Sequence, residues 1–258
     1  MSRATWRGTN ERVIAAAVQF RAPKGRPAET RQALASWLDR ATAEGAGLVV
    51  FPELATTGYI WESPEELAPH AEPAQGPTFE ALAPLAAERG AWVVCGFPER
   101  DEHGRLYNSA LVIDGQGQLV ACYRKVLLFE ADKPWALPGD TRMLIRTPFG
   151  VLMPAICMDI NDDGLIRALA RHQPDVLAFP TSWVEEGMDV HGYWRARLRT
   201  FRGVMVAADN WGEDRGTTFA GRSAVLGAGG VLAQRGPEGD GLALAELPIR
   251  APASSAPA

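Results

Sequence analysis

The sequence predicts an α/β fold in which sheets of β-strands are covered by helices on their outer faces. Short apolar runs alternate with segments of helical periodicity, and several of the runs pair as hairpins. The pattern occurs in both halves of the 258 residues with no linker-like stretch between them, which favours one domain over residues 12–250. We expect residues 1–11 to form a flexible arm and the small, Pro-rich residues 251–258 a disordered tail.

The strands of the first half are short, almost wholly apolar runs, as in strands that are covered on both faces. The first helix has Leu34, Trp37 and Leu38 at the spacing of one helical face. Gly90 stands where the second helix needs a C-cap, and Gly115-Gln116-Gly117 is typical of a hairpin turn. The expected elements are a strand at 13–18, a helix around 34–41, a strand at 47–51, a helix at 78–88, a strand at 91–97 and a hairpin of strands 107–114 and 118–123.

The second half repeats this order of apolar runs and helical segments. Helices are expected around Asp163–Arg171 and Tyr193–Phe201. The expected strands are 143–146, 151–156, 175–179, 204–208, 223–226, 231–234 and 242–247.

Composition narrows the possible partners and compartments. A net charge of -5 gives no electrostatic reason to expect nucleic acid or an anionic membrane, and the Arg-rich stretch 195–202 has the spacing of a helix face. The chain shows no CxxC or HExxH motif for a metal, no signal peptide and no apolar run of membrane-spanning length. Three widely spaced cysteines favour a reducing compartment, so we expect a cytoplasmic protein.

Cys157 ends an apolar strand and is followed abruptly by the polar stretch Met158-Asp159-Ile160-Asn161-Asp162. A cysteine at the end of a buried strand is most often an ordinary core residue. The polar turn, however, favours a position at a sheet edge that faces a cleft, where α/β proteins bind ligands. Cys157 is therefore a candidate nucleophile.

Two further strand ends carry charged residues in apolar surroundings. Glu53 follows Phe51-Pro52 and precedes an apolar, Gly-containing loop, so desolvation should raise its proton affinity and suit it to act as a base. Lys125 enters the apolar run 126–129, where a buried ammonium could lower a thiol pKa and stabilise an oxyanion. A surface carboxylate and a surface ion pair are the ordinary alternatives for these two residues.

In these motifs the chain resembles the nitrilase, or carbon–nitrogen hydrolase, superfamily. The matching pieces are Phe51-Pro52-Glu53-Leu54 with Gly58-Tyr59, Tyr123-Arg124-Lys125-Val126 and Ile156-Cys157-Met158-Asp159, supported by Asn108-Ser109-Ala110, Pro138-Gly139-Asp140, Trp183 and Gly221-Arg222-Ser223. The resemblance implies a four-layer αββα sandwich, a homodimer or higher homo-oligomer, and chemistry without metal or cofactor. It implies Cys157 as nucleophile, Glu53 as general base and Lys125 as electrostatic stabiliser, with the Met158 backbone N–H helping to hold the oxyanion.

The chain also departs from the family's pattern. The second carboxylate of many relatives falls by spacing on Asp132, with Glu130 as the alternative. Asn161 lies where relatives usually carry a different segment after the nucleophile, which indicates an unusual substrate pocket. We expect Tyr59, Trp183, Asn161 and His191 to line that pocket.

The predicted function is thiol-dependent hydrolysis of a small amide, of the amidase, omega-amidase or N-carbamoyl amidohydrolase type. A nitrile hydrolase using the same triad is the close alternative. Two other classes stay open from the sequence, namely a catalytically impaired binding protein with this fold and an acyltransferase in which an amine intercepts the thioester.

Overall fold

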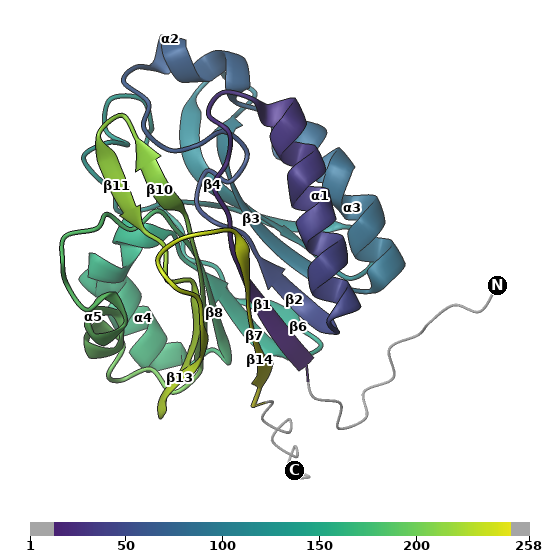
Figure 1. Ribbon diagram of the computed structural model, residues 1–258, viewed down its shortest axis with the longest axis vertical. Helices are drawn as coiled ribbons and strands as arrows, with labels where there is room; N and C mark the ends of the chain where they lie inside the picture. The colour runs from purple at the N-terminus through teal and green to yellow at the C-terminus, as the bar shows by residue number, and fades with distance from the viewer. Residues whose placement is uncertain (1–12, 249–258) are drawn as a thin grey trace.

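The computed structural model describes residues 13–248 of the chain. The arm predicted at 1–11 and the tail predicted at 251–258 lie outside this range, as do both ends of the domain predicted at 12–250. Within the range, two six-stranded sheets pack face to face and carry helices on their outer faces (Figure 1).

The first sheet has the strand order β14-β1-β2-β3-β4-β5. Strands β1 and β2 and strands β2 and β3 pair in parallel, and the other pairs are antiparallel. Its strands are β1 (Val13–Gln19), β2 (Ala46–Val50), β3 (Trp92–Arg100), β4 (Leu106–Ile113), β5 (Leu119–Arg124) and β14 (Gly241–Leu247).

The second sheet has the order β13-β12-β9-β8-β7-β6, and its central strands β7, β8 and β9 are parallel. Its strands are β6 (Ile145–Thr147), β7 (Gly150–Pro154), β8 (Val176–Thr181), β9 (Val204–Asp209), β12 (Ala224–Gly227) and β13 (Gly230–Gln234). Every strand expected from the sequence is present, with ends that differ by a few residues.

Three apolar layers hold the four structural layers together. One lies between the two sheets and includes Val50, Leu152 and Val206. A second packs helices α1 (Pro27–Ala43) and α3 (Pro77–Arg89) on the first sheet, and a third packs α4 (Asp163–His172) and α5 (Val190–Arg197) on the second. The predicted αββα sandwich is confirmed, because each sheet buries both faces.

The helix predicted at Tyr193–Phe201 begins and ends earlier in the structure. Helix α5 starts three residues before Tyr193 because the Asp189 side chain caps it by accepting the Gly192 N–H. It ends before Leu198, after which the Phe201 N–H bonds to the Leu198 carbonyl in a separate turn. The helix α3, in contrast, ends as expected at Gly90, whose φ of 67° is the left-handed conformation of a glycine cap.

Several short elements at one end of the sandwich are not predicted by the sequence pattern. They are α2 (Pro64–Leu67), the 3-10 helices η1 (Ala68–His70) and η2 (Cys157–Asn161), and the hairpin of β10 (Trp211–Asp214) and β11 (Thr217–Ala220). A fourth apolar group, which includes Tyr59, Trp135 and Phe219, packs beneath this end of the molecule. Within residues 13–248, no helix combines the length and apolar character that a membrane span requires.

Candidate active site

The three predicted site residues follow strands that end at the same edge of the sandwich. Glu53 follows β2 and Lys125 follows β5, which runs in the same direction as β2 because two antiparallel pairings separate them. Cys157 follows β7 of the facing sheet. Parallel strands of one sheet present their carboxyl ends together, which places Glu53 and Lys125 at one edge. Cys157 of the facing sheet lies close enough to this edge for both of their charges to act on its thiol.

Glu53, Lys125 and Asp132 form a fully buried ionic cluster. The Lys125 ammonium lies 2.6 Å from Oε1 of Glu53 and 2.6 Å from Oδ2 of Asp132. The amide nitrogen of Asn108 donates to the same two carboxylates, at 2.8 Å to Glu53 and 3.0 Å to Asp132. The second oxygen of Glu53, Oε2, has no hydrogen-bond partner among the described protein groups.

The structure places Asp132 in this cluster and Glu130 outside it. Asp132 also accepts hydrogen bonds from the Tyr59 hydroxyl at 3.2 Å and from the Phe129 N–H at 2.9 Å. Glu130 is exposed and pairs with the exposed Lys133. Of the two candidates for the second carboxylate, Asp132 is therefore the one in contact with Lys125.

Cys157 has a backbone conformation that its neighbours must impose. Its φ is 43°, in the left-handed region, and Leu54 next to Glu53 has a φ of 45°. Such a conformation costs a non-glycine residue about 1–3 kcal/mol and is concentrated at functional sites. Cys157 is 6% exposed, so the residue is almost completely buried.

Burial has the largest effect on the pKa of the Cys157 thiol. It raises the pKa of Cys157 well above the ordinary value, and the Glu53 charge adds to this shift, although Lys125 lowers it. The expectation that Lys125 favours the thiolate is therefore correct in direction, but burial outweighs it. The Thr181 side chain and the Ser182 backbone N–H also lower the pKa of Cys157, although less than burial raises it.

Burial and their mutual interaction shift the pKa values of both partners of the thiol, Glu53 and Lys125. Burial raises the pKa of Glu53 above its ordinary value, and the Asp132 charge adds to this while Lys125 opposes it. Burial works against the charge of Lys125, but the carboxylates of Asp132 and Glu53 outweigh it and raise the pKa of the ammonium. Lys125 thus stays a fixed positive charge in an apolar setting.

Asp159 joins the loop of the ammonium to the loop of the thiol. Its Oδ1 accepts the N–H groups of Val126 and Leu127 at 3.0 and 2.8 Å, directly after Lys125. Its Oδ2 accepts the Ile156 N–H at 2.9 Å and the Tyr123 hydroxyl at 2.7 Å. One buried carboxylate therefore fixes the spacing between the two loops.

A glycine permits the close approach that places Glu53. A Cβ on Gly96 of β3 would lie 2.4 Å from the Pro52 carbonyl oxygen and 2.6 Å from the Glu53 Cα. The Gly96 N–H donates to that same Pro52 oxygen. Only glycine fits between this strand and the Glu53 turn.

The remaining predicted residues differ in whether they contact the cluster. Tyr59 belongs to it through Asp132. Trp183 is half-buried against Trp194 and Tyr193. Asn161 accepts from the Tyr193 hydroxyl and donates to the Met158 sulfur, while His191 contacts the Arg222 carbonyl oxygen at 2.7 Å.

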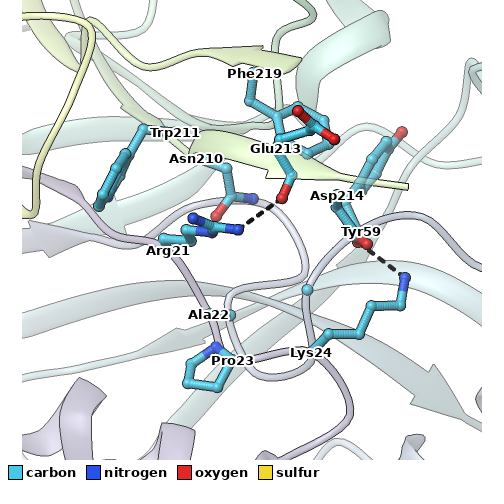
Figure 2. Close-up of a pocket in the computed structure, with 11 residues that line it drawn as sticks. Arg21, Ala22, Pro23, Lys24, Tyr59, Asn210, Trp211, Glu213, Asp214 and Phe219 are labelled. Atoms are coloured by element: carbon cyan, nitrogen blue, oxygen red, sulfur yellow. Dashed lines mark hydrogen bonds and ion pairs between the residues drawn. The ribbon is translucent and has the colours of Figure 1, made fainter. Parts of the chain in front are cut away.

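A cavity of about 350 Å³ lies beside the cluster, under the β10–β11 hairpin (Figure 2). Tyr59 and Asn210 line it on the side of the ionic cluster, and neither Cys157 nor Trp183 is among its lining residues. Two cations hold the hairpin over it: Arg21 donates to the Glu213 carbonyl at 2.7 Å, and Lys24 pairs with Asp214 at 2.9 Å.

Sequence reasoning gave no role to several polar side chains of this site. Asn108 lies within β4, and Thr181, Asp209 and Asn210 lie at or directly after the ends of β8 and β9; all four are buried. Within residues 13–248, no group of three or more His, Cys, Asp and Glu side chains is arranged to hold a metal ion.

Fold and site together define the class, an enzyme that hydrolyses carbon–nitrogen bonds, and comparison with known proteins supports this assignment. The chain belongs to the carbon–nitrogen hydrolase family of the nitrilase superfamily, whose family model matches residues 14–252.

Individual relatives carry names of both amidases and nitrilases. A nitrilase of Pyrococcus abyssi is 33% identical over 195 residues, covering 73% of this chain and 71% of that protein. Mouse deaminated glutathione amidase is 28% identical over 241 residues, covering 86% of this chain and 73% of that protein.

The fold also matches a solved amidase. The amidase of Nesterenkonia sp. AN1 superposes with a TM-score of 0.82 at 25% identity, covering 92% of this chain and 90% of that one. In that structure, of a Glu-to-Gln variant, the acetamide moiety of fluoroacetamide is attached covalently to the active-site cysteine. Membership of the family makes the chemistry of this chain the hydrolysis of a carbon–nitrogen bond.

Proposed function

We propose that the protein hydrolyses a small amide through a thioester on Cys157, with Glu53 as the proton carrier and Lys125 as the fixed cation. The observation that carries this proposal is the asymmetry of Glu53. One oxygen, Oε1, is held by Lys125 and Asn108, while Oε2 has no partner among the described protein groups and the carboxylate charge acts on the sulfur. A carboxylate held by one oxygen is oriented and still free to take a proton through the other.

In the first step Glu53 takes the thiol proton as the sulfur attacks the amide carbonyl carbon. The carbonyl π electrons move to oxygen, and the resulting oxyanion is stabilised by Lys125 and the backbone N–H of Met158. The first N–H groups of a helical turn have no partner within the turn, and Met158 lies in the first turn of η2. The raised pKa of Cys157 supports a thiol that gives up its proton only during attack.

The tetrahedral intermediate then collapses and the carbon–nitrogen bond breaks. The leaving nitrogen takes the proton from Glu53 and departs as ammonia, which leaves an acyl group in thioester linkage to Cys157. Water next gives a proton to Glu53 and attacks the thioester carbon. Collapse of this second intermediate releases the acid, and the sulfur recovers its proton from Glu53.

Asp132 is the second carboxylate in this proposal. It contacts Lys125 in addition to Glu53 and shares Asn108 with it, so it fixes the ammonium between two anions. Tyr59 closes the cluster and lines the adjacent cavity, which suits it to contact the acyl part of a substrate. Trp183, Asn161 and His191 remain predicted pocket residues.

The substrate class follows from the family and the site. The relatives include a deaminated glutathione amidase and a nitrilase, so we place a small amide first and a nitrile second. A nitrile would give a thioimidate on the same sulfur and require two waters to reach the acid. A cytoplasmic location and a homodimeric or larger assembly also remain predictions, the second of which light scattering on the purified protein measures directly.

A substrate panel tests the proposal. Primary amides, omega-amides, N-carbamoyl amino acids and nitriles are assayed for ammonia release, with intact mass recorded during turnover. We expect ammonia from at least one amide and a mass increase equal to its acyl group. Ammonia from nitriles alone would move the assignment to the nitrilase type, and turnover by Cys157→Ala at the wild-type rate would refute the proposed chemistry.

A further inference from the structure

Asp209 is a buried carboxylate that the proposed chemistry leaves without a role. It ends β9, is fully buried, and accepts the Trp183 N–H through Oδ1 at 2.9 Å. Its other oxygen, Oδ2, has no hydrogen-bond partner among the described protein groups. A half-satisfied buried carboxylate reduces stability, so its presence calls for an explanation.

Register places Asp209 beside a segment that lies next to the nucleophile. Pro154 pairs with Ala178 across β7 and β8, and Cys157 and Thr181 each lie three residues beyond that pair. Thr181 in turn pairs with Asp209 across β8 and β9. Paired residues of neighbouring strands project from the same face of a sheet, so Asp209 lies next to Thr181.

The segment Thr181-Ser182-Trp183 lies next to both reacting partners. By register Thr181 lies beside the turn of Cys157, and the Thr181 side chain and the Ser182 N–H lower the pKa of that thiol, which supports this position. The Thr181 carbonyl accepts the Glu53 N–H at 3.4 Å. Asp209 holds the residue that follows Ser182 through the Trp183 N–H.

Asp209 and the residue after it are themselves held in place. The Asp209 N–H donates to the Ser223 hydroxyl oxygen at 2.8 Å, so the strand end is anchored to the segment that leads into β12. Asn210 donates to the Ser182 hydroxyl oxygen at 2.7 Å and to the Glu53 carbonyl at 2.9 Å. The end of β9 therefore forms a rigid support behind the segment.

We propose that Asp209 is a positioning residue for the nucleophile: by accepting the Trp183 N–H it fixes residues 181–183, which lie by register beside the turn of Cys157 and accept the Glu53 N–H. This inference rests on the proposed function, because it takes Cys157 as the nucleophile. A displacement of about 1 Å at a reacting group lowers rates on the order of 100-fold, so a support of this kind governs the rate.

The charge state of Asp209 indicates which substitution preserves the support. Burial raises the pKa of Asp209 well above its ordinary value, and the charges of Glu53 and Glu185 add to the shift, while the N–H groups of Trp183 and Asn210 oppose it. A neutral carboxylic acid and an asparagine amide both present one carbonyl oxygen to the Trp183 N–H. Asp209→Asn should therefore keep the support, and Asp209→Ala should remove it.

The test compares these two variants with a matched control. Glu72 is also a buried carboxylate that accepts one backbone N–H, from Thr78 at 3.1 Å, and leaves its other oxygen without a hydrogen-bond partner among the described groups. This bond holds the first turn of α3, away from the cluster residues, so Glu72→Ala is expected to lower stability and leave the chemistry unchanged. Thermal unfolding and circular dichroism establish that each variant is folded.

The readouts are the rate of Cys157 alkylation by iodoacetamide, located by peptide mass mapping, and kcat and KM for the amide found in the panel. We expect Asp209→Ala to lower the alkylation rate and kcat on the order of 10- to 100-fold with KM little changed, and Asp209→Asn to restore both to within about threefold. Should Asp209→Ala fail to fold, Asp209→Asn compared with Asp209→Leu, which fills the space without an acceptor, serves in its place.

A folded Asp209→Ala or Asp209→Leu protein with wild-type alkylation rate and kcat would overturn the inference, as would an equal loss in Glu72→Ala. A different result would show that the proposed function is wrong. In that case Cys157→Ala itself would keep wild-type turnover, whatever the activity of the Asp209 variants.

Discussion

The ammonium of Lys125 lies 2.6 Å from Oε1 of Glu53, and both side chains are completely buried. The same ammonium is bonded to Asp132, so one cation serves two carboxylates in an apolar interior. Burying these three charges is unfavourable unless each is paired, and removing the cation alone leaves two carboxylates unpaired. Lys125 therefore contributes both to the stability of the protein and to its activity.

Lys125→Met keeps most of the side-chain volume and removes the charge. We expect a loss of about 3–5 kcal/mol in the free energy of unfolding, the usual cost of breaking a buried pair, and a fall in kcat/KM by several orders of magnitude. Urea unfolding and steady-state assays measure the two effects. Lys133→Met is the control, since Lys133 pairs with Glu130 on the surface and its loss should change neither quantity.

Asp132→Asn and Glu130→Gln separate the two candidates for the second carboxylate. Asp132 contacts Lys125 and Glu130 does not, so we expect Asp132→Asn to reduce kcat on the order of 100-fold or more and Glu130→Gln to leave it unchanged. Steady-state kinetics on both variants decide the point. The opposite order of effects would assign the role to the exposed residue, against the geometry.

The pH dependence of kcat/KM should report Glu53. The residue must be ionised to accept the thiol proton, and burial raises its pKa above the ordinary value of about 4.3. Activity is therefore lost as the pH falls through the raised pKa, and the acid limb of the profile lies above that ordinary value. The Asp132 charge contributes to the shift, so the limb of Asp132→Asn should move to lower pH, whereas that of Glu130→Gln should not move.

Gly96→Ala tests the packing that places Glu53. The added Cβ would lie 2.4 Å from the Pro52 carbonyl oxygen, a contact that forces the Glu53 turn away from β3. We expect a lowered melting temperature and a kcat reduced more than the stability loss explains, because the carboxylate moves relative to the sulfur. Gly104→Ala provides a comparison, because a Cβ added there would meet no atom within 4 Å, although the φ of 76° at Gly104 adds backbone strain. Unchanged kcat in a folded Gly96→Ala protein would contradict the role given to this contact.

The site residues at the strand ends can be predicted from the sequence, because each is a charged or nucleophilic residue next to an apolar run. Glu53 and Cys157 lie where such runs stop, Lys125 lies between two of them, and Asp132 follows from the spacing found in the family that the chain resembles. The roles of Asn108 and Asp209 cannot be predicted in this way, because a buried polar residue in a strand looks the same whether it serves packing or a site. The φ of 43° at Cys157 leaves no mark in the residue pattern, since it is imposed by the surrounding chain.

The β10–β11 hairpin is a part of the fold that the sequence pattern does not predict. Its strands, Trp211–Asp214 and Thr217–Ala220, are short and lack a regular apolar alternation, so the sequence predicts no strand there. The turn between them is Arg215-Gly216, with φ values of 49° and 76°, which is a two-residue hairpin turn with both central residues in the left-handed region. The glycine is the one local signal of this turn.

The covalent intermediate on Cys157 is the central claim, and rapid quenching during turnover of an amide, followed by intact mass and peptide mapping, tests it most directly. We predict a mass increase equal to the acyl group of the amide, confined to the peptide that contains Cys157 and missing from Cys157→Ala, with Cys95 and Cys122 unmodified. Turnover with no acyl adduct at Cys157, together with wild-type ammonia release by Cys157→Ala, would contradict it.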